Sequence, residues 1–126
     1  MAKLYKTPRQ GPAKDAPAGT AELLIENLIV ADTFFTRGMG LLARKDIASN
    51  EALWIKRTNN IHTWFMRIKI DCIFIDRNLE IKKIVSNIPA FRFVGPFWKS
   101  SSVIETQAGF AESKNLKVGD QLHVVN

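Results

Sequence analysis

The side chains that could do chemistry concentrate between residues 59 and 76. This stretch holds His62, Trp64, Lys69, Asp71 and Asp76 around a strongly apolar run. Polar groups in apolar surroundings cost stability unless partners satisfy them, so they mark either a core network or the border of a site. The stretch therefore predicts both the middle of the core and the edge of any functional site.

Seven side chains are candidates for a ligand-binding site. Arginine, lysine and histidine donate hydrogen bonds to anions, and tryptophan supplies an apolar wall. The seven are Arg37, Arg44, His62, Trp64, Lys69, Asp71 and Glu105. Together they predict a non-enzymatic binding domain with a cleft beside residues 62–71, which takes a small anionic ligand or an acidic segment of a partner protein.

Two other interpretations of these residues stay open. A buried ion-pair network would join the guanidinium of Arg37 to Asp71 or Glu105, because guanidinium matches carboxylate geometry. A metal site of His62, Asp71 and Glu105 would make the protein a metal-assisted enzyme, since imidazole and carboxylate suit zinc or iron. The sequence lacks a His-x-x-x-His or His-x-His spacing, and we assign no catalytic residue, metal ligand or cofactor.

The net charge of +6 comes largely from the middle of the chain. Residues 54–99 contain nine basic and three acidic side chains. A basic excess favours acidic partners or anionic ligands, although it is also typical of a solvated face. Aromatic residues alternate with the bases here, a pattern typical of single-stranded nucleic-acid binding. Nucleic acid is therefore a further alternative partner.

The composition is that of one soluble domain. The chain has 126 residues, of which 46% are hydrophobic and 24% charged, enough for a single core. The lone cysteine, Cys72, excludes an intrachain disulfide and is expected to be a small buried hydrophobe. The chain shows no signal peptide and no apolar span of about 18 residues, so we expect a cytoplasmic protein without membrane contact.

Local patterns predict an α+β fold. Residues 1–20 contain three prolines and few large apolar groups, which predicts a flexible basic arm before a globular domain over residues 21–126. Short helices are expected after Asp32 and over 108–116, and the predicted strands cover residues 22–31, 52–58, 68–76, 81–88, 100–106 and 121–125. The architecture is mainly antiparallel β, a single compact sheet or partly closed barrel with two short helices.

The strand over 68–76 carries the clearest alternation. Ile70, Cys72 and Phe74 share one face, and Asp71 and Ile73 share the other. We expect its far end to be buried on both faces and its start to meet water or a site. A hairpin turn follows over 77–80, with Asn78 predicted in the left-handed conformation.

Five short motifs in order resemble those of one known family. They are Ala31-Asp32-Thr33 with Arg37 and Gly40-Leu41-Leu42-x-Arg44, then His62-Thr63-Trp64-Phe65-Met66, then Ile70-Asp71 through Asp76, then Val103-Ile104-Glu105 with Ala108-Gly109, and Gly119-Asp120. Over roughly residues 22–124 the chain is similar to the family called domain of unknown function 192. The resemblance implies a compact, mostly β domain with short helices, and it implies no settled activity.

Overall fold

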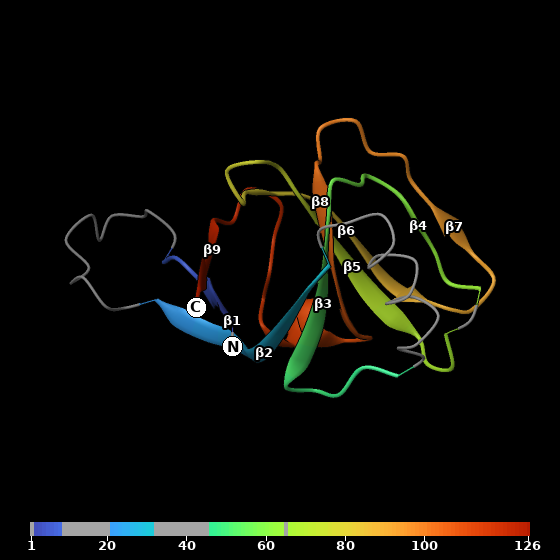
Figure 1. Ribbon diagram of the computed structural model, residues 1–126, viewed down its shortest axis with the longest axis horizontal. Coiled ribbons are helices and arrows are strands. Elements are labelled where there is room, and N and C mark those ends of the chain that lie inside the picture. Colours follow the sequence, from blue (N-terminus) through green and yellow to red (C-terminus); the bar gives the residue numbers. More distant parts are fainter. Residues whose placement is uncertain (1, 9–20, 32–45, 65) are drawn as a thin grey trace.

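The computed structural model describes residues 2–8, 21–31, 46–64 and 66–126. Within these ranges the chain forms nine strands and one short helix (Figure 1). They are β1 (Ala2–Lys6), β2 (Glu22–Ala31), β3 (Glu51–Lys56), β4 (Ile61–His62), β5 (Ile70–Ile75), β6 (Ile81–Ile88), β7 (Phe93–Val94), β8 (Ser102–Gln107), α2 (Phe110–Ser113) and β9 (Leu122–Val125). The protein is therefore mostly β.

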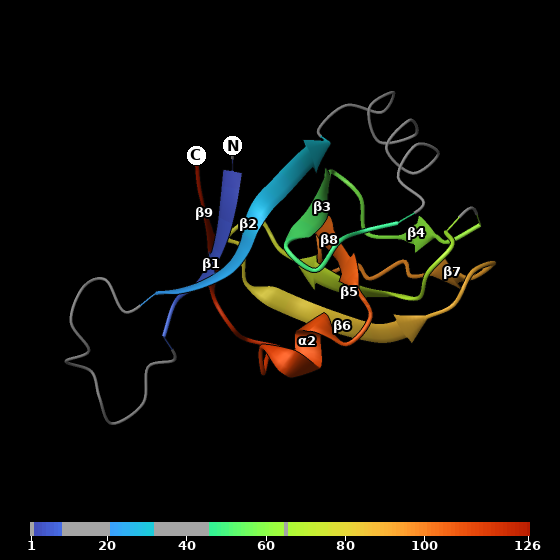
Figure 2. The same ribbon diagram turned by 90° about the horizontal axis from the view of Figure 1, so that it is seen from below.

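Seven strands form one curled sheet in the order β6-β5-β8-β3-β2-β1-β9, and β4 pairs with β7 in a separate small sheet. The β2–β3 pair is parallel and the other neighbours are antiparallel. At one end the two sheet edges meet, because Glu80 bridges to Gln121 and the N–H of Leu122 donates to Leu79 at 2.9 Å. The sheet is therefore a mixed half-barrel, which confirms the mainly β prediction (Figures 1 and 2).

Two short helices were predicted, and the described residues cover one of them. The second predicted helix is present as α2, which has four residues and lies against the sheet (Figure 2). The helix expected after Asp32 falls in residues 32–45, outside the described residues. The described part of the chain thus contains one short helix, and the helix after Asp32 stays a prediction. It has no helix with the length and apolar character that crossing a bilayer requires.

Strand β5 divides the core into two clusters. Ile73 and Ile75 pack in one cluster with Phe110 of α2, whereas Cys72 and Phe74 pack in the other with β4 and β7 residues. This confirms the predicted alternation of faces and the burial of Cys72. The start of the predicted strand meets water as expected, because Lys69 is exposed and Ile68 is half-buried, whereas burial is complete from Ile70 and Asp71 onward.

The turn over residues 76–80 differs from the prediction in which residue is left-handed. The left-handed residue is Leu79, at φ 63°, and not Asn78. Asp76 holds the turn, since its Oδ1 accepts hydrogen bonds from the N–H groups of Asn78 at 2.9 Å and Glu80 at 3.0 Å. The leucine side chain packs against the core cluster on the α2 side, and this burial offsets the cost of a positive φ.

Residues 2–6, which the sequence placed in a flexible arm, form β1 between β2 and β9. Leu4 is completely buried and joins the core. A short strand with partners on both sides is stabilised by their backbone hydrogen bonds, which its own composition does not reveal. Residues 9–20 of the predicted arm lie outside the described residues.

Candidate functional site

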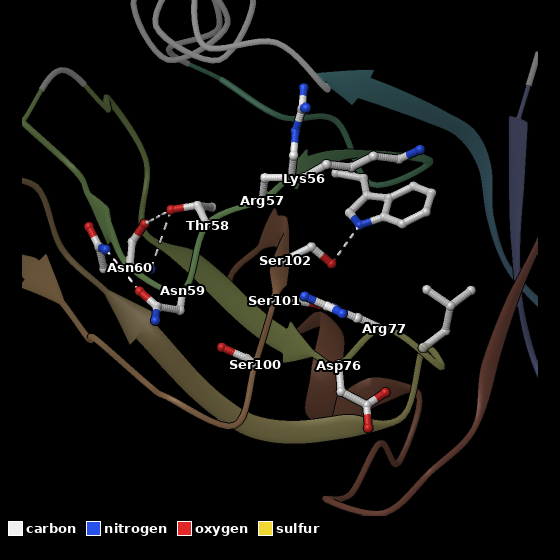
Figure 3. A pocket seen from close by; sticks show the side chains of 12 residues that line it. Lys56, Arg57, Thr58, Asn59, Asn60, Asp76, Arg77, Ser100, Ser101 and Ser102 are labelled. Carbon is white, nitrogen blue, oxygen red and sulfur yellow. Dashed lines mark hydrogen bonds between the residues drawn. The ribbon is translucent and has the colours of Figure 1, made fainter.

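An open groove of about 650 Å³ lies where β3 ends, β8 begins and β5 turns into β6 (Figure 3). Antiparallel pairing brings these segments together, because Ser102 is opposite both Lys56 on β3 and Ile75 on β5. The lining residues are Trp54, Lys56, Arg57, Thr58, Asn59, Asn60, Asp76, Arg77, Leu79, Ser100, Ser101 and Ser102. The groove is therefore assembled from three regions far apart in the sequence.

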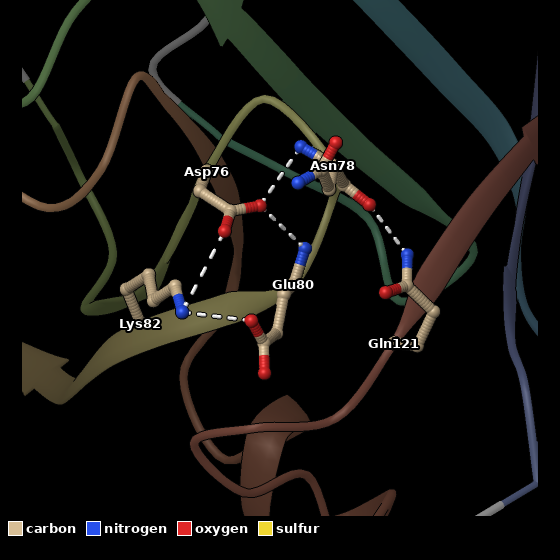
Figure 4. A network of polar contacts seen from close by, with 5 residues as sticks. All are labelled: Asp76, Asn78, Glu80, Lys82 and Gln121. Carbon is tan, nitrogen blue, oxygen red and sulfur yellow. Dashed lines mark hydrogen bonds and ion pairs between the residues drawn. The ribbon is translucent and has the colours of Figure 1, made fainter.

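Three of the lining side chains are cationic, namely Lys56, Arg57 and Arg77, and one is acidic, Asp76. The acid is engaged in its own turn. Besides the two backbone hydrogen bonds to Oδ1, its Oδ2 lies 3.6 Å from Nζ of Lys82 (Figure 4). The described lining thus contains more positive than negative side chains.

Lys82 is in turn held by Glu80, whose Oε2 lies 2.7 Å from Nζ. This hydrogen bond, with the nearby charges of Glu80 and Asp76, raises the pKa of Lys82. The two acids of the β5–β6 turn, Asp76 and Glu80, are therefore paired with Lys82. Arg77 is not part of this network. Figure 3 shows the Arg77 side chain extending into the groove.

The groove wall is organised by hydrogen bonds. Trp54 Nε1 donates to Ser102 Oγ at 2.9 Å, and Nζ of Lys56 lies 4.5 Å from the centroid of the Trp54 ring. The N–H of Thr58 donates to the carbonyl of Ser101 at 3.0 Å, and the N–H of Ser101 donates to Ile75 at 2.8 Å. These bonds tie three strands together around the groove, so the site is preformed.

The five described candidates from the sequence lie elsewhere. His62, Trp64, Lys69, Asp71 and Glu105 are all absent from the groove lining. Arg37 and Arg44 lie outside the described residues. The cleft proposed beside residues 62–71 therefore stays a prediction.

Asp71 has a structural role. Its Oδ1 accepts the N–H of Asn87 at 3.0 Å, and its Oδ2 accepts the N–H groups of Gly109 at 3.1 Å and Ala111 at 3.0 Å. The residue before α2 is Gly109, which has no side chain to cap the helix. The strand carboxyl thus satisfies helix N–H groups that would otherwise lack partners.

Asp71 and Glu105 point to opposite faces of the sheet. Glu105 is directly opposite Cys72, so these two share a face, and Asp71 precedes Cys72 on an alternating strand. No cluster of three His, Cys, Asp or Glu side chains suited to a metal occurs among the described residues. The sheet thus keeps apart two residues that the ion-pair and metal hypotheses brought together.

Glu105 is almost completely buried, at 1% exposure, and its Oε1 has no hydrogen-bond partner in the described structure. Desolvation raises its pKa to about 8, because burial disfavours the charged form. Burial also raises the pKa of the neighbouring Cys72 thiol. His62 has a buried Nδ1 that likewise lacks a described partner, and its ring meets Trp64 edge-on at 5.5 Å.

The sequence missed the groove residues for a topological reason. The basic excess over 54–99 was visible, but the pattern gave no reason to select Lys56, Arg57 and Arg77 from nine bases. Their common position depends on β8 pairing with both β3 and β5. The run Ser100-Ser101-Ser102, at the start of the strand predicted over 100–106, was the one local signal, and by itself it specifies no site.

Fold and groove together define a small, mostly β half-barrel with an open basic groove. A crystal structure of a protein of unknown function from Novosphingobium aromaticivorans shares this fold, with a TM-score of 0.75 and 17% identity, over 96% of this chain and 83% of the other.

The chain belongs to the DUF192 family, described as "Uncharacterized ACR", whose model matches residues 17–124. It is 34% identical to a UPF0127 protein of Thermococcus sibiricus over 99 residues, covering 74% of this chain and 62% of that relative's length. A UPF0127 protein of Pyrococcus furiosus is 32% identical over 95 residues, covering 73% of this chain and 81% of the relative. These comparisons confirm the family resemblance, and they support no specific function.

Proposed function

We propose that the domain binds an anionic ligand in the groove between β3, β8 and the β5–β6 turn. The observation that carries this proposal is the set of three cationic side chains around a groove whose one acid is held by its own turn. Guanidinium groups suit phosphate and carboxylate oxygens because their N–H donors match the spacing of two oxygens.

The remaining lining supports the same ligand class. Thr58 and Ser100–Ser102 bring hydroxyl groups, and Asn59 and Asn60 bring amides. The volume lies within the usual range of about 300–1,000 Å³ for small-molecule sites. We propose binding without catalysis, because cationic, hydroxyl and amide groups of this kind serve as hydrogen-bond donors to a bound anion.

The test is calorimetric titration with pyrophosphate and tripolyphosphate. Removing a charged hydrogen bond typically costs about 1.5–3 kcal/mol, so Arg77→Ala is expected to weaken binding by about tenfold or more. Lys3→Ala is the matched control, because Lys3 is exposed on β1, a strand that contributes no groove residue. Its affinity is expected to equal that of the wild type.

Two outcomes contradict the proposal. One is the absence of saturable binding to either anion at millimolar concentration. The other is equal weakening by Arg77→Ala and Lys3→Ala, which indicates only a general attraction to a basic surface. Lys69→Ala separates the two possible sites. If Lys69→Ala weakens binding and Arg77→Ala does not, the ligand binds in the cleft predicted beside residues 62–71.

A further inference from the structure

Four large aromatic side chains are exposed on the described surface. Trp98 is 82% exposed, Phe91 67%, Phe93 61% and Trp64 42%. Leaving such rings in water forgoes the hydrophobic stabilisation of burial, and clustered exposed apolar groups often mark an interaction surface. Trp64 follows β4, Phe91 precedes β7, Phe93 lies in β7, and Trp98 lies in the loop from β7 to β8.

Trp98 stands at the rim of the groove. The N–H of Phe97 donates to the carbonyl of Asn59 at 3.0 Å, and both N–H and Oγ of Ser100 donate to the carbonyl of Phe97. Asn59 and Ser100 both line the groove. The turn that carries Trp98 is thus fixed against the groove wall by three hydrogen bonds.

The aromatic residues alternate with exposed bases. Arg92 lies between Phe91 and Phe93, Lys99 follows Trp98, and all of these side chains are exposed. The three acids of residues 54–99 are engaged internally: Asp71 by backbone N–H groups, Asp76 by its turn, and Glu80 by Lys82. This surface therefore offers a ligand cations and ring faces.

We propose that the anion bound in the groove is the phosphate backbone of a single-stranded nucleic acid, whose bases stack on Trp98 and then on the exposed rings of the β7 segment. This inference rests on the proposed function and specifies its ligand. Unpaired bases offer free faces to aromatic side chains, whereas the bases of a duplex are already stacked on each other. A mononucleotide engages the groove and Trp98 alone, and it leaves Phe91 and Phe93 unused.

The test is fluorescence anisotropy of labelled 12-nucleotide oligo(dT) and oligo(U), with a labelled hairpin duplex and labelled UMP as comparisons. We expect the single strands to bind more tightly than either comparison. Their affinity is expected to fall steeply as salt rises, because phosphate contacts release counterions.

Trp98 and Arg77 variants assign the contacts. We expect Trp98→Ala to weaken single-strand binding by roughly tenfold and Trp98→Phe to retain most of it, because phenylalanine keeps a stacking face. Arg77→Ala is expected to weaken single-strand and tripolyphosphate binding alike. Val118→Ala, at another apolar side chain that is 61% exposed, is the control and is expected to change neither.

The outcomes separate this inference from the proposed function. Arg77-dependent binding of tripolyphosphate with no preference for single strands, or with Trp98→Ala unchanged, overturns the nucleic-acid inference and leaves the anion groove in place. If the wild type binds no tripolyphosphate either, both the nucleic-acid inference and the proposed function are overturned. Competition by poly-glutamate as strong as that by oligo(U) of equal charge also overturns the inference, in favour of an acidic protein partner.

Discussion

Glu105 lies in β8 between Leu53 on β3 and Cys72 on β5. Both neighbours are buried, so an ionised carboxyl there would lose its hydration without gaining a described partner. The proton therefore stays on this side chain until the pH approaches the raised pKa of about 8. At neutral pH the sheet contains a neutral acid where the sequence suggested a charged member of a network.

The pH dependence of stability follows from this pKa. The unfolded chain releases the Glu105 proton near pH 4.5, and the folded protein retains it to about pH 8. Between these values the folded state binds more protons, so the unfolding free energy decreases as pH rises, by up to roughly 5 kcal/mol from this group. Urea denaturation at pH 5, 7 and 9 measures the decrease.

Glu105→Gln removes the titrating proton with little change of shape. We expect this variant to lose most of the pH dependence and to be more stable than the wild type at pH 9. Glu112→Gln is the control, because Glu112 is exposed on α2, and it is expected to behave as the wild type. An unchanged pH slope in Glu105→Gln would show that Glu105 ionises normally in the folded protein.

At the scale of elements, the loop after β7 contacts the groove wall and helps to fix its position, as the strands do. Gly95 has a φ of 103°, and a Cβ built there would lie 2.6 Å from the carbonyl oxygen of Asn59 and 2.9 Å from Cβ of Asn60. Asn59 and Asn60 both line the groove. The loop after β7 therefore packs against the groove wall at a point where only glycine fits.

Gly95→Ala is expected to destabilise the fold by about 2 kcal/mol or more, because both the backbone conformation and the contact are unfavourable. Gly119→Ala is the matched control, since Gly119 has a similar φ of 98° with no atom within 4 Å of a built Cβ. The control is expected to show the smaller conformational cost alone. Equal losses in thermal denaturation would contradict the close approach of Gly95 to Asn59.

Sequence patterns predicted the longer elements and missed the shortest ones. Strand β6 was predicted with its observed bounds, and β5 with the correct faces, because six to eight residues rich in isoleucine on either side of a turn are enough to indicate strands. Strands β4 and β7 have two residues each, too few for any periodicity. The left-handed Leu79 was missed because its packing against the core outweighs the local preference for asparagine.

The same distinction applies to the candidate site. The basic middle segment predicted an anion-binding domain, whereas the family resemblance implied no activity; both are properties of the sequence itself. The groove depends on β8 pairing with β3 and β5 from distant parts of the chain, and no local pattern specifies that pairing. The sequence made Asp71 and Glu105 candidates for one site or ion-pair network. Only the strand register shows that their side chains point to opposite faces of the sheet.

At the scale of the whole molecule, β1 joins the edge strand β9 to the rest of the curled sheet. It pairs with β2 on one side and β9 on the other. Strand β9 then reaches the β5–β6 turn, where the N–H of Leu122 donates to the carbonyl of Leu79, and the amide of Gln121 donates to Asn78 (Figure 4). Since Leu79 lines the groove, the first strand is connected to the site through β9.

Leu4→Ala tests this connection, because Leu4 is fully buried in the same core cluster as Leu122 of β9. Leucine-to-alanine changes in cores cost about 2–5 kcal/mol, so a large fall in the urea midpoint is expected, whereas Lys3→Ala on the exposed side of β1 should leave it nearly unchanged.

Deleting residues 1–7 should go further, since it leaves β9 without its strand partner and loosens the turn that carries Arg77. We therefore expect the deletion to weaken tripolyphosphate binding as well as to lower stability. A deleted protein that remains folded and binds the anion as tightly as the wild type would show that the groove forms independently of β1 and β9.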